Sequence, residues 1–222
     1  MNNDGKADIV TANFNSSYSV LLGDGTGGFT VTRTQMTVSP DAIRLADLNR
    51  NGFLDIAFTA PSSNQIAVLL GNGNGAFGSP AVFTAGLQPA ELAVGDFNLD
   101  GKLDVVTADE VSHSFSLLLG NGAGGFGAAT SFSEPGSVSA IVAADFNGDG
   151  RLDVADTNYG ASFNVSVRFG RGNGTFDPPV NFAISFGSFS LAVGKFGSSC
   201  KPDLVMSLSS VIRMPVLFNN CL

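Results

Sequence analysis

The sequence is poor in the residues that build most catalytic and metal sites: 222 residues include no Trp, two Tyr, one His and two Cys. One His and two Cys supply too few nitrogen and sulfur ligands for a convincing zinc site. No apolar run approaches the roughly 18 residues that a membrane-spanning helix requires, so we expect a soluble chain. The opening Met-Asn-Asn-Asp does not resemble a signal peptide. Any export signal is therefore expected to lie outside these residues.

Basic residues are also scarce, with 11 Lys and Arg against 19 Asp and Glu and a net charge of −8. The basic residues are scattered singly, and such an acidic chain would repel a polyanion, which argues against a nucleic-acid partner. Ten of the 19 acidic residues lie in four short loops. This concentration indicates that bound cations neutralise them locally.

Glycine and phenylalanine are abundant, with 28 and 19 residues, and they follow a repeat. The first motif recurs as LADLNRNGFLDIAF (45–58), VGDFNLDGKLDVVT (94–107) and AADFNGDGRLDVAD (143–156), with a shortened copy NNDGKADIVT (2–11) and a decayed copy VGKFGSSCKPDLVM (193–206). The second recurs as SVLLGDGTGGF (19–29), AVLLGNGNGAF (67–77), SLLLGNGAGGF (116–126) and SVRFGRGNGTF (166–176). A period of about 50 residues is typical of stacked repeats.

Each repeat predicts four short strands. In the third repeat they are expected at about 91–97, 103–108, 115–120 and 126–132, and glycine supplies the positive φ that the tight turn between the last two requires. Runs such as LDVV are apolar at consecutive positions, which suits sheets covered on both faces. Four strands per repeat without helical periodicity favour the blades of a β-propeller over a sandwich.

The loop Asp-Phe-Asn-x-Asp-Gly-x-x-Asp, followed by Gly-Asn-Gly-x-Gly-x-Phe, resembles the FG-GAP/VCBS repeat, which is related to the β-propeller of integrin α subunits. The resemblance covers nearly the whole chain. It implies a calcium-binding propeller, usually on a secreted or cell-surface protein, so we expect an extracellular or cell-surface location. It does not fix a function, because the family includes adhesion domains, lectins and appendages of enzymes.

We therefore predict an all-β fold, a single β-propeller domain over residues 1–222 with four-stranded antiparallel blades. Five blades are expected, and they correspond to repeat units of about 1–37, 38–86, 87–135, 136–186 and 187–222. The first and last units each hold only three predicted strands. A larger propeller of which this is a part, an unusual closure between the ends, and pairing with a second chain all remain open. An incomplete ring is expected to self-associate.

The acidic loops have the spacing of a calcium site, because calcium takes six to eight hard oxygen ligands and a loop with ligands at alternating positions surrounds it. Positions 1, 3, 5 and 9 supply side chains and position 7 a backbone carbonyl. Three complete sites are expected, at Asp47, Asn49, Asn51, Phe53 and Asp55; at Asp96, Asn98, Asp100, Lys102 and Asp104; and at Asp145, Asn147, Asp149, Arg151 and Asp153. The first unit retains Asn2, Asp4, Lys6 and Asp8 as a partial fourth site.

Two other interpretations fit these loops less well. An EF-hand requires a bidentate Glu at position 12 between two helices, whereas position 12 here is Phe58, Thr107 or Asp156 and β-type sequence follows. Simple Asx-rich turns would explain single loops but not one spacing shared by four. The loop of the second unit has two carboxylates and is predicted to bind calcium more weakly than the loops of the third and fourth units. The fifth unit, with Lys195 at position 1, has lost its site.

Cys200 and Cys221 are disulfide candidates, because both are expected on the same face of the last blade with one strand between them. A disulfide would fix the C-terminus and suit an oxidising compartment. Two unpaired thiols are the alternative.

Two functions remain open. The first is a calcium-stabilised recognition module that binds a protein or glycan partner through the face opposite the calcium loops, which we call the variable face. The lack of Trp argues against a glycan partner. The second is a calcium-dependent hydrolase, similar to lactonases or esterases, with its site on that variable face or in the central channel. Its weak catalytic candidates are His113, Glu110 and Asp109. A lone His on a loop is more often a solvated surface residue.

Overall fold

The computed structural model is an all-β fold of antiparallel sheets, and the one helix among its described residues is the 3₁₀ turn η1 (Pro61–Ser63). The structure describes residues 1–13, 15–160, 163–184, 187–197, 200–208 and 214–219. Within these ranges no helix is long and apolar enough to cross a membrane.

Within the described residues the strands form five separate sheets, each lying within one repeat unit. In sequence order the sheets contain β1 (Ile9–Asn13), β2 (Ser17–Gly23) and β3 (Phe29–Gln35); β4 (Ile43–Ala46), β5 (Asp55–Ala60), β6 (Gln65–Leu69) and β7 (Ala81–Thr84); β8 (Pro89–Gly95), β9 (Asp104–Asp109), β10 (Ser114–Leu118) and β11 (Thr130–Ser133); β12 (Ser137–Ala144), β13 (Asp153–Tyr159), β14 (Asn164–Arg168) and β15 (Val180–Ala183); and β16 (Ser188–Gly194), β17 (Asp203–Leu208) and β18 (Val216–Leu217). Within each sheet, neighbouring strands are consecutive in the chain.

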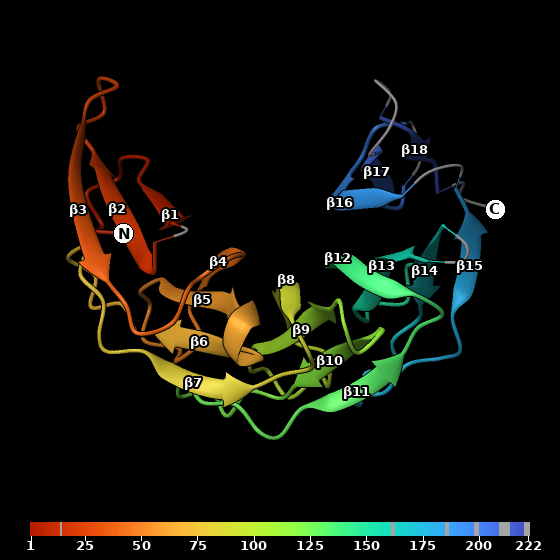
Figure 1. Ribbon diagram of the computed structural model, residues 1–222. Helices are drawn as coiled ribbons and strands as arrows, with labels where there is room; N and C mark the ends of the chain where they lie inside the picture. Colours follow the sequence, from red (N-terminus) through yellow and green to blue (C-terminus); the bar gives the residue numbers. More distant parts are fainter. Residues whose placement is uncertain (14, 161–162, 185–186, 198–199, 209–213, 220–222) are drawn as a thin grey trace.

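The sheets stand side by side around an open arc, as blades do in a propeller (Figure 1). The first strands of the second to fifth sheets, β4, β8, β12 and β16, lie toward the inside of the arc, and β3, β7, β11 and β15 lie at its outer rim. The first and last sheets stand at the two tips. The predicted β-propeller architecture is thus confirmed.

The hydrophobic core is divided among the spaces between neighbouring sheets. One cluster joins the third and fourth sheets through residues such as Val106, Phe115 and Val154, and similar clusters fill the other three spaces. Every residue of β5 and β9 is buried. This explains why the second strand of each repeat is apolar at consecutive positions: both of its faces meet a neighbouring sheet.

The fourth strand of the middle sheets starts later than predicted. In the third sheet, Phe126 pairs only with Gly120, and regular pairing resumes at Thr130, opposite Leu117. One more residue lies between the pairs on the fourth strand than on the third, which is the geometry of a β-bulge. The second and fourth sheets have the same interruption, whereas the β2–β3 hairpin pairs without a break.

Candidate metal-binding loops and the opposite face

The three complete acidic loops have nearly the same hydrogen bonds. In the fourth unit, Asp145 Oδ2 accepts from the Gly150 N–H at 2.8 Å. Asn147 Oδ1 accepts from the Asp149 N–H at 2.8 Å, and Asp149 Oδ1 accepts from the Arg151 N–H at 2.9 Å. The loops of the second and third units have the corresponding bonds. Side chains of positions 1, 3 and 5 therefore face the inside of one tight turn.

The loop backbone turns through left-handed residues at two positions. The sixth-position glycines have φ values between +78° and +86°; they are Gly5, Gly52, Gly101 and Gly150. The fourth position is left-handed as well, at Asn3, Arg50, Leu99 and Gly148. Only the glycine adopts this conformation without steric cost.

The ninth-position aspartate ties the loop to the glycine-rich turn of the same sheet. Asp153 is fully buried, and its Oδ1 accepts from the Gly170 N–H at 2.8 Å while Oδ2 accepts from the Phe146 N–H at 2.8 Å. The equivalent carboxylates accept from a backbone N–H at or just after the end of the second strand that follows the loop, at 2.8 to 2.9 Å, in the pairs Asp8–Gly23, Asp55–Gly71, Asp104–Gly120 and Asp203–Asn219. The loops and glycine-rich turns thus share one face of the arc.

Burial and neighbouring carboxylates both act on these aspartates. Burial raises the pKa of Asp104 above its ordinary value, and the nearby charges of Asp96 and Asp100 raise the pKa further. Burial likewise raises the pKa of Asp55 and of Asp153. A backbone hydrogen bond from residue 102 is the main cause of the lowered pKa of Asp100. Several carboxylates are therefore held close enough to repel one another.

The donor set of these loops fits calcium in its chemistry. All the predicted ligands are oxygens, with three carboxylates in the third and fourth units and two in the second. In the part of the chain that the structure describes, no three His, Cys, Asp or Glu side chains gather around one metal position. The carboxylates instead accept backbone hydrogen bonds, but each carboxylate has about four lone-pair positions and keeps capacity for a cation.

The first and fifth units differ from this pattern. The N-terminal ammonium of Met1 contacts Asp8 Oδ2 at 2.6 Å, where complete loops place a backbone N–H. Hydrogen bonding from this ammonium is the largest cause of the lowered pKa of Asp8. The fifth unit has Lys195 and Gly197 in place of the ligands at positions 1 and 3, yet its Asp203 Oδ2 still accepts from the Phe196 N–H at 2.8 Å, as Asp153 does from Phe146.

On the opposite face, backbone hydrogen bonds extend the strand pairing of the third sheet into its loops. The Val111 N–H donates to the Leu87 carbonyl at 3.2 Å, and the Glu134 N–H donates to the His113 carbonyl at 2.9 Å. Leu87 and Val111 are exposed aliphatic side chains, with exposed fractions of 47% and 53%. This face therefore combines exposed polar groups with a small apolar patch.

The three weak catalytic candidates lie in different environments. His113 is exposed and has a left-handed backbone, with a φ of 49°. Asp109 is fully buried at the end of β9, where its carboxylate accepts from Thr107 Oγ1 at 2.8 Å and Ser116 Oγ at 2.6 Å. Burial raises the pKa of Asp109 to about 6. Glu110 follows it, half-buried, at the start of the loop.

The inner wall of the arc is largely apolar. It is formed by the first strands of four sheets, with residues such as Leu45, Val94 and Val142, around a hollow of about 510 Å³. Arg44 lines this hollow and forms an ion pair with Glu91 at 3.0 Å. No His lies among the residues that line it.

Sequence reasoning missed a buried polar cluster between the third and fourth sheets. Glu134 pairs with Arg168, and Asp156 is fully buried beside them. Burial raises the pKa of both acids, and the charge of Glu134 raises that of Asp156 further. Asn158 Nδ2 donates to Asp156 Oδ1 at 2.7 Å. One signal was available: Asp156 occupies the loop position at which the other complete repeats have Phe58 or Thr107.

The predicted disulfide cannot be followed to its second partner, because Cys221 lies outside the described residues. Cys200 lies three residues before the start of β17, in the connection between β16 and β17. The pairing stays a prediction.

The chain matches a known repeat family in sequence and several solved structures in fold. The sequence model of the FG-GAP-like repeat matches residues 1–58, 47–107 and 96–155. A search of curated proteins finds no match. Among solved structures, a candidate 6-phosphogluconolactonase of Bacteroides uniformis is 13% identical, with a TM-score of 0.73 over 96% of this chain and 64% of the other.

Two further structures resemble the chain. A protein of Lactobacillus plantarum is 16% identical, with a TM-score of 0.70 over 94% of this chain and 63% of the other. BBS1N, crystallised in complex with ARL6DN, is 12% identical, with a TM-score of 0.63 over 90% of this chain and 58% of the other. At these identities the likeness shows the fold alone, and the chain spans less than two thirds of each of these proteins.

Proposed function

Because the chain belongs to the FG-GAP-like repeat family, we propose that it is a calcium-stabilised β-propeller recognition module. Its partner, a protein or a glycan, binds the face opposite the calcium loops. The observation that carries this proposal is the contrast between the two faces. One face repeats the same loop bonds in three complete units, whereas the other carries residues that differ from repeat to repeat.

The calcium ions belong to the repeated face. Positions 1, 3, 5, 7 and 9 of each complete loop would hold one ion, and the ion would neutralise carboxylates that otherwise repel one another. Each loop is tied through its ninth-position aspartate to the glycine-rich turn of the same sheet. Calcium binding would therefore stabilise each sheet at this end and make a rigid base for the opposite face.

The partner site belongs to the variable face, and its chemistry favours a protein. Leu87 and Val111 are neighbours through a backbone hydrogen bond and expose aliphatic side chains beside polar loops. Apolar anchors within a polar rim are typical of protein interfaces. A glycan site would more often offer Trp or Tyr, and this chain has no Trp. The family is common in extracellular proteins, which supports a secreted or cell-surface location.

Selection of binders tests the site. A library of displayed peptides and a glycan array are screened against the whole chain in calcium. The selected binders are then measured against a Leu87→Asp/Val111→Asp variant and against Val31→Asp, which alters an exposed side chain on the rim strand β3.

We expect the double variant to bind peptides at least tenfold more weakly while Val31→Asp binds normally. Peptides that bind the double variant as tightly as the wild-type chain would contradict the proposal. Selection of glycans alone would assign the site to the other partner class.

A further inference from the structure

The second residue of each complete acidic loop lies at the junction between two sheets. Its side chain is buried in the hydrophobic cluster that its own sheet forms with the next sheet: Leu48 between the second and third sheets, Phe97 between the third and fourth, and Phe146 between the fourth and fifth. In the sequence this residue stands between two predicted calcium ligands, at positions 1 and 3. Each loop therefore has a ligand on either side of a residue that contacts the next sheet.

The backbone of this residue also joins the two sheets. Its N–H donates to the ninth-position aspartate of its own loop, at 2.9 Å for Leu48, 3.0 Å for Phe97 and 2.8 Å for Phe146. Its carbonyl accepts from the glycine-rich turn of the next sheet. The Leu48 carbonyl accepts from the Gly124 N–H at 3.2 Å, and the Phe97 carbonyl accepts from the Gly174 N–H at 3.1 Å. The residue thus holds its own sheet through its N–H and the next sheet through its carbonyl.

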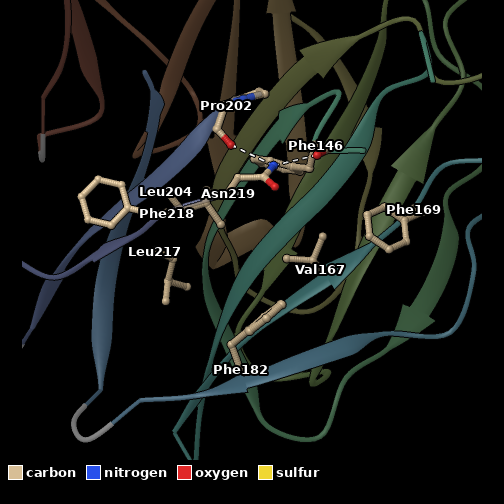
Figure 2. Close-up of a pocket in the computed structure, with 9 residues that line it drawn as sticks. All are labelled: Phe146, Val167, Phe169, Phe182, Pro202, Leu204, Leu217, Phe218 and Asn219. Carbon is tan, nitrogen blue, oxygen red and sulfur yellow. Dashed lines mark hydrogen bonds between the residues drawn. The ribbon is translucent and has the colours of Figure 1, made fainter. Parts of the chain in front are cut away.

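The junction between the fourth and fifth sheets has the same bond with a different donor. Asn219 follows β18 and takes the place of the first turn glycine, because its N–H donates to the ninth-position aspartate Asp203 at 2.8 Å. Its side chain donates from Nδ2 to the Phe146 carbonyl at 2.7 Å (Figure 2). At each of the three junctions that follow the complete loops, the second-position carbonyl therefore accepts a hydrogen bond from the next sheet.

The fourth-position side chain makes a second contact with the same turn. A Cβ added to Gly122 would lie 3.6 Å from Arg50 Cδ, and a Cβ added to Gly172 would lie 2.8 Å from Leu99 Cδ1. Arg50 and Leu99 have left-handed backbones, with φ values of 62° and 58°, so their side chains are aimed by the tight turn of the loop. The conformation of each of these loops therefore sets its contact with the following sheet at two points.

We propose that calcium bound in one loop closes the junction between its own sheet and the next sheet in the chain. Positions 1 and 3 would hold the ion, and this fixes the residue between them with its carbonyl against the following turn. Without the ion, the carboxylates of the loop repel one another and the junction opens more readily. The effect runs one way along the chain, because the second-position carbonyl contacts the sheet that follows. This inference rests on the calcium binding proposed above and adds what the ion does between sheets.

Hydrogen exchange at two glycine amides measures two junctions separately. The whole chain is prepared with isotope-labelled glycine, and exchange at Gly124 and Gly174 is followed by NMR over a series of buffered calcium concentrations. Asn51→Asp gives the second loop a third carboxylate, and Asp100→Asn removes one from the third loop. Each variant is the control for the other, because both change the ligand at position 5. Titration calorimetry on the same samples measures calcium binding independently.

We expect calcium to slow exchange at both amides about tenfold or more. An ion at a hundredfold excess over its Kd makes an opening that releases it about a hundredfold less frequent. Asn51→Asp should shift the protection of Gly124 to lower calcium concentrations and leave Gly174 unchanged. Asp100→Asn should shift the protection of Gly174 to higher concentrations and leave Gly124, which lies in the same sheet as the substitution, unchanged.

The two proposals fail in different ways. Calcium binding without slower exchange at Gly124 and Gly174 would overturn the junction proposal and leave the calcium-stabilised module standing. A shift at Gly124 in Asp100→Asn would also overturn it, because the ion would then act within its own sheet. A chain that binds no calcium in the calorimeter would contradict both proposals.

Discussion

At the scale of single residues, the ninth-position aspartate has a structural role apart from any metal. The fifth unit shows this, because it has Lys195 and Gly197 where other loops have ligands, yet it keeps Asp203. Asp203 accepts backbone hydrogen bonds from Phe196 and from Asn219, as its counterparts do. Backbone donors offset the cost of burying a carboxylate. The aspartate therefore persists where the ion-binding residues do not.

Asp109 is expected to make stability depend on pH. Its pKa is about 6 in the fold because of burial, against about 4 when unfolded. The folded state binds the proton more tightly, so its stability falls as pH rises from about 4 to about 6. The loss amounts to about 3 kcal/mol. Asp109→Asn should remove this loss and raise the free energy of unfolding at pH 7.5 by about 1 to 3 kcal/mol.

Urea unfolding of the wild type and Asp109→Asn at several pH values measures this effect. Asn158, the equivalent residue of the next sheet, shows that an amide suits the position. Asp41→Asn makes the same charge change at an exposed residue and is the control. If the wild type and Asp109→Asn lose stability in parallel between pH 4 and 6, the burial of this carboxylate is not the cause.

At the scale of elements, the first glycine of each glycine-rich turn is required because a side chain would not fit there, and not because of its backbone φ angle. A Cβ on Gly120 would lie 2.0 Å from the Leu103 carbonyl oxygen, a backbone atom that cannot turn aside. The later glycines of the turn, Gly122 and Gly124, do have positive φ values. The motif thus combines a close approach of two backbones with a left-handed turn.

Gly120→Ala should therefore destabilise the fold by about 2 to 4 kcal/mol, through steric strain and weakening of the Gly120–Asp104 hydrogen bond. Gly127→Ala is the matched control, because its added Cβ would lie 3.7 Å from the Leu119 carbonyl oxygen, an ordinary contact. Thermal unfolding of the two variants makes the comparison. A similar loss in both would show that the close approach at Gly120 is unimportant.

Local patterns predicted the elements well and their long-range contacts poorly. The second and third strands of the third repeat lie within two residues of their predicted ends, because their apolar runs and flanking turns are local signals. The late start of β11 depends on a bulge against β10, which no local signal marks. Asp109 lies one residue beyond the predicted strand at 103–108, yet in the structure it ends β9 and is buried near Gly86. Such burial depends on the neighbouring sheet.

At the scale of the whole molecule, polar side chains occur inside the spaces between sheets as well as on the surface. Ser114 and Ser116 lie with Asp109 between the second and third sheets, and Glu134 pairs with Arg168 between the third and fourth. The space between the first two sheets is instead filled mainly by apolar residues such as Phe58 and Val20. The repeated loops therefore hold together sheets whose contacts differ from one space to the next.

Calcium is expected to act on the whole arc through these loops. An ion that binds only the folded chain stabilises it by about 2.7 kcal/mol at a hundredfold excess over its Kd, so calcium should raise the melting temperature and chelation should lower it. Titration calorimetry should show two affinity classes, because the second unit has two carboxylates and the third and fourth have three.

Asp149→Asn should weaken or abolish one of the tighter calcium sites without destabilising the sheet. Asp149 is exposed, and the carboxylate that ties the loop to the glycine-rich turn is the buried Asp153. Asp177→Asn, at an exposed ion pair outside the loops, is the control. Unchanged calcium binding in Asp149→Asn would show that this loop holds no calcium, and a melting temperature indifferent to calcium would contradict its stabilising role.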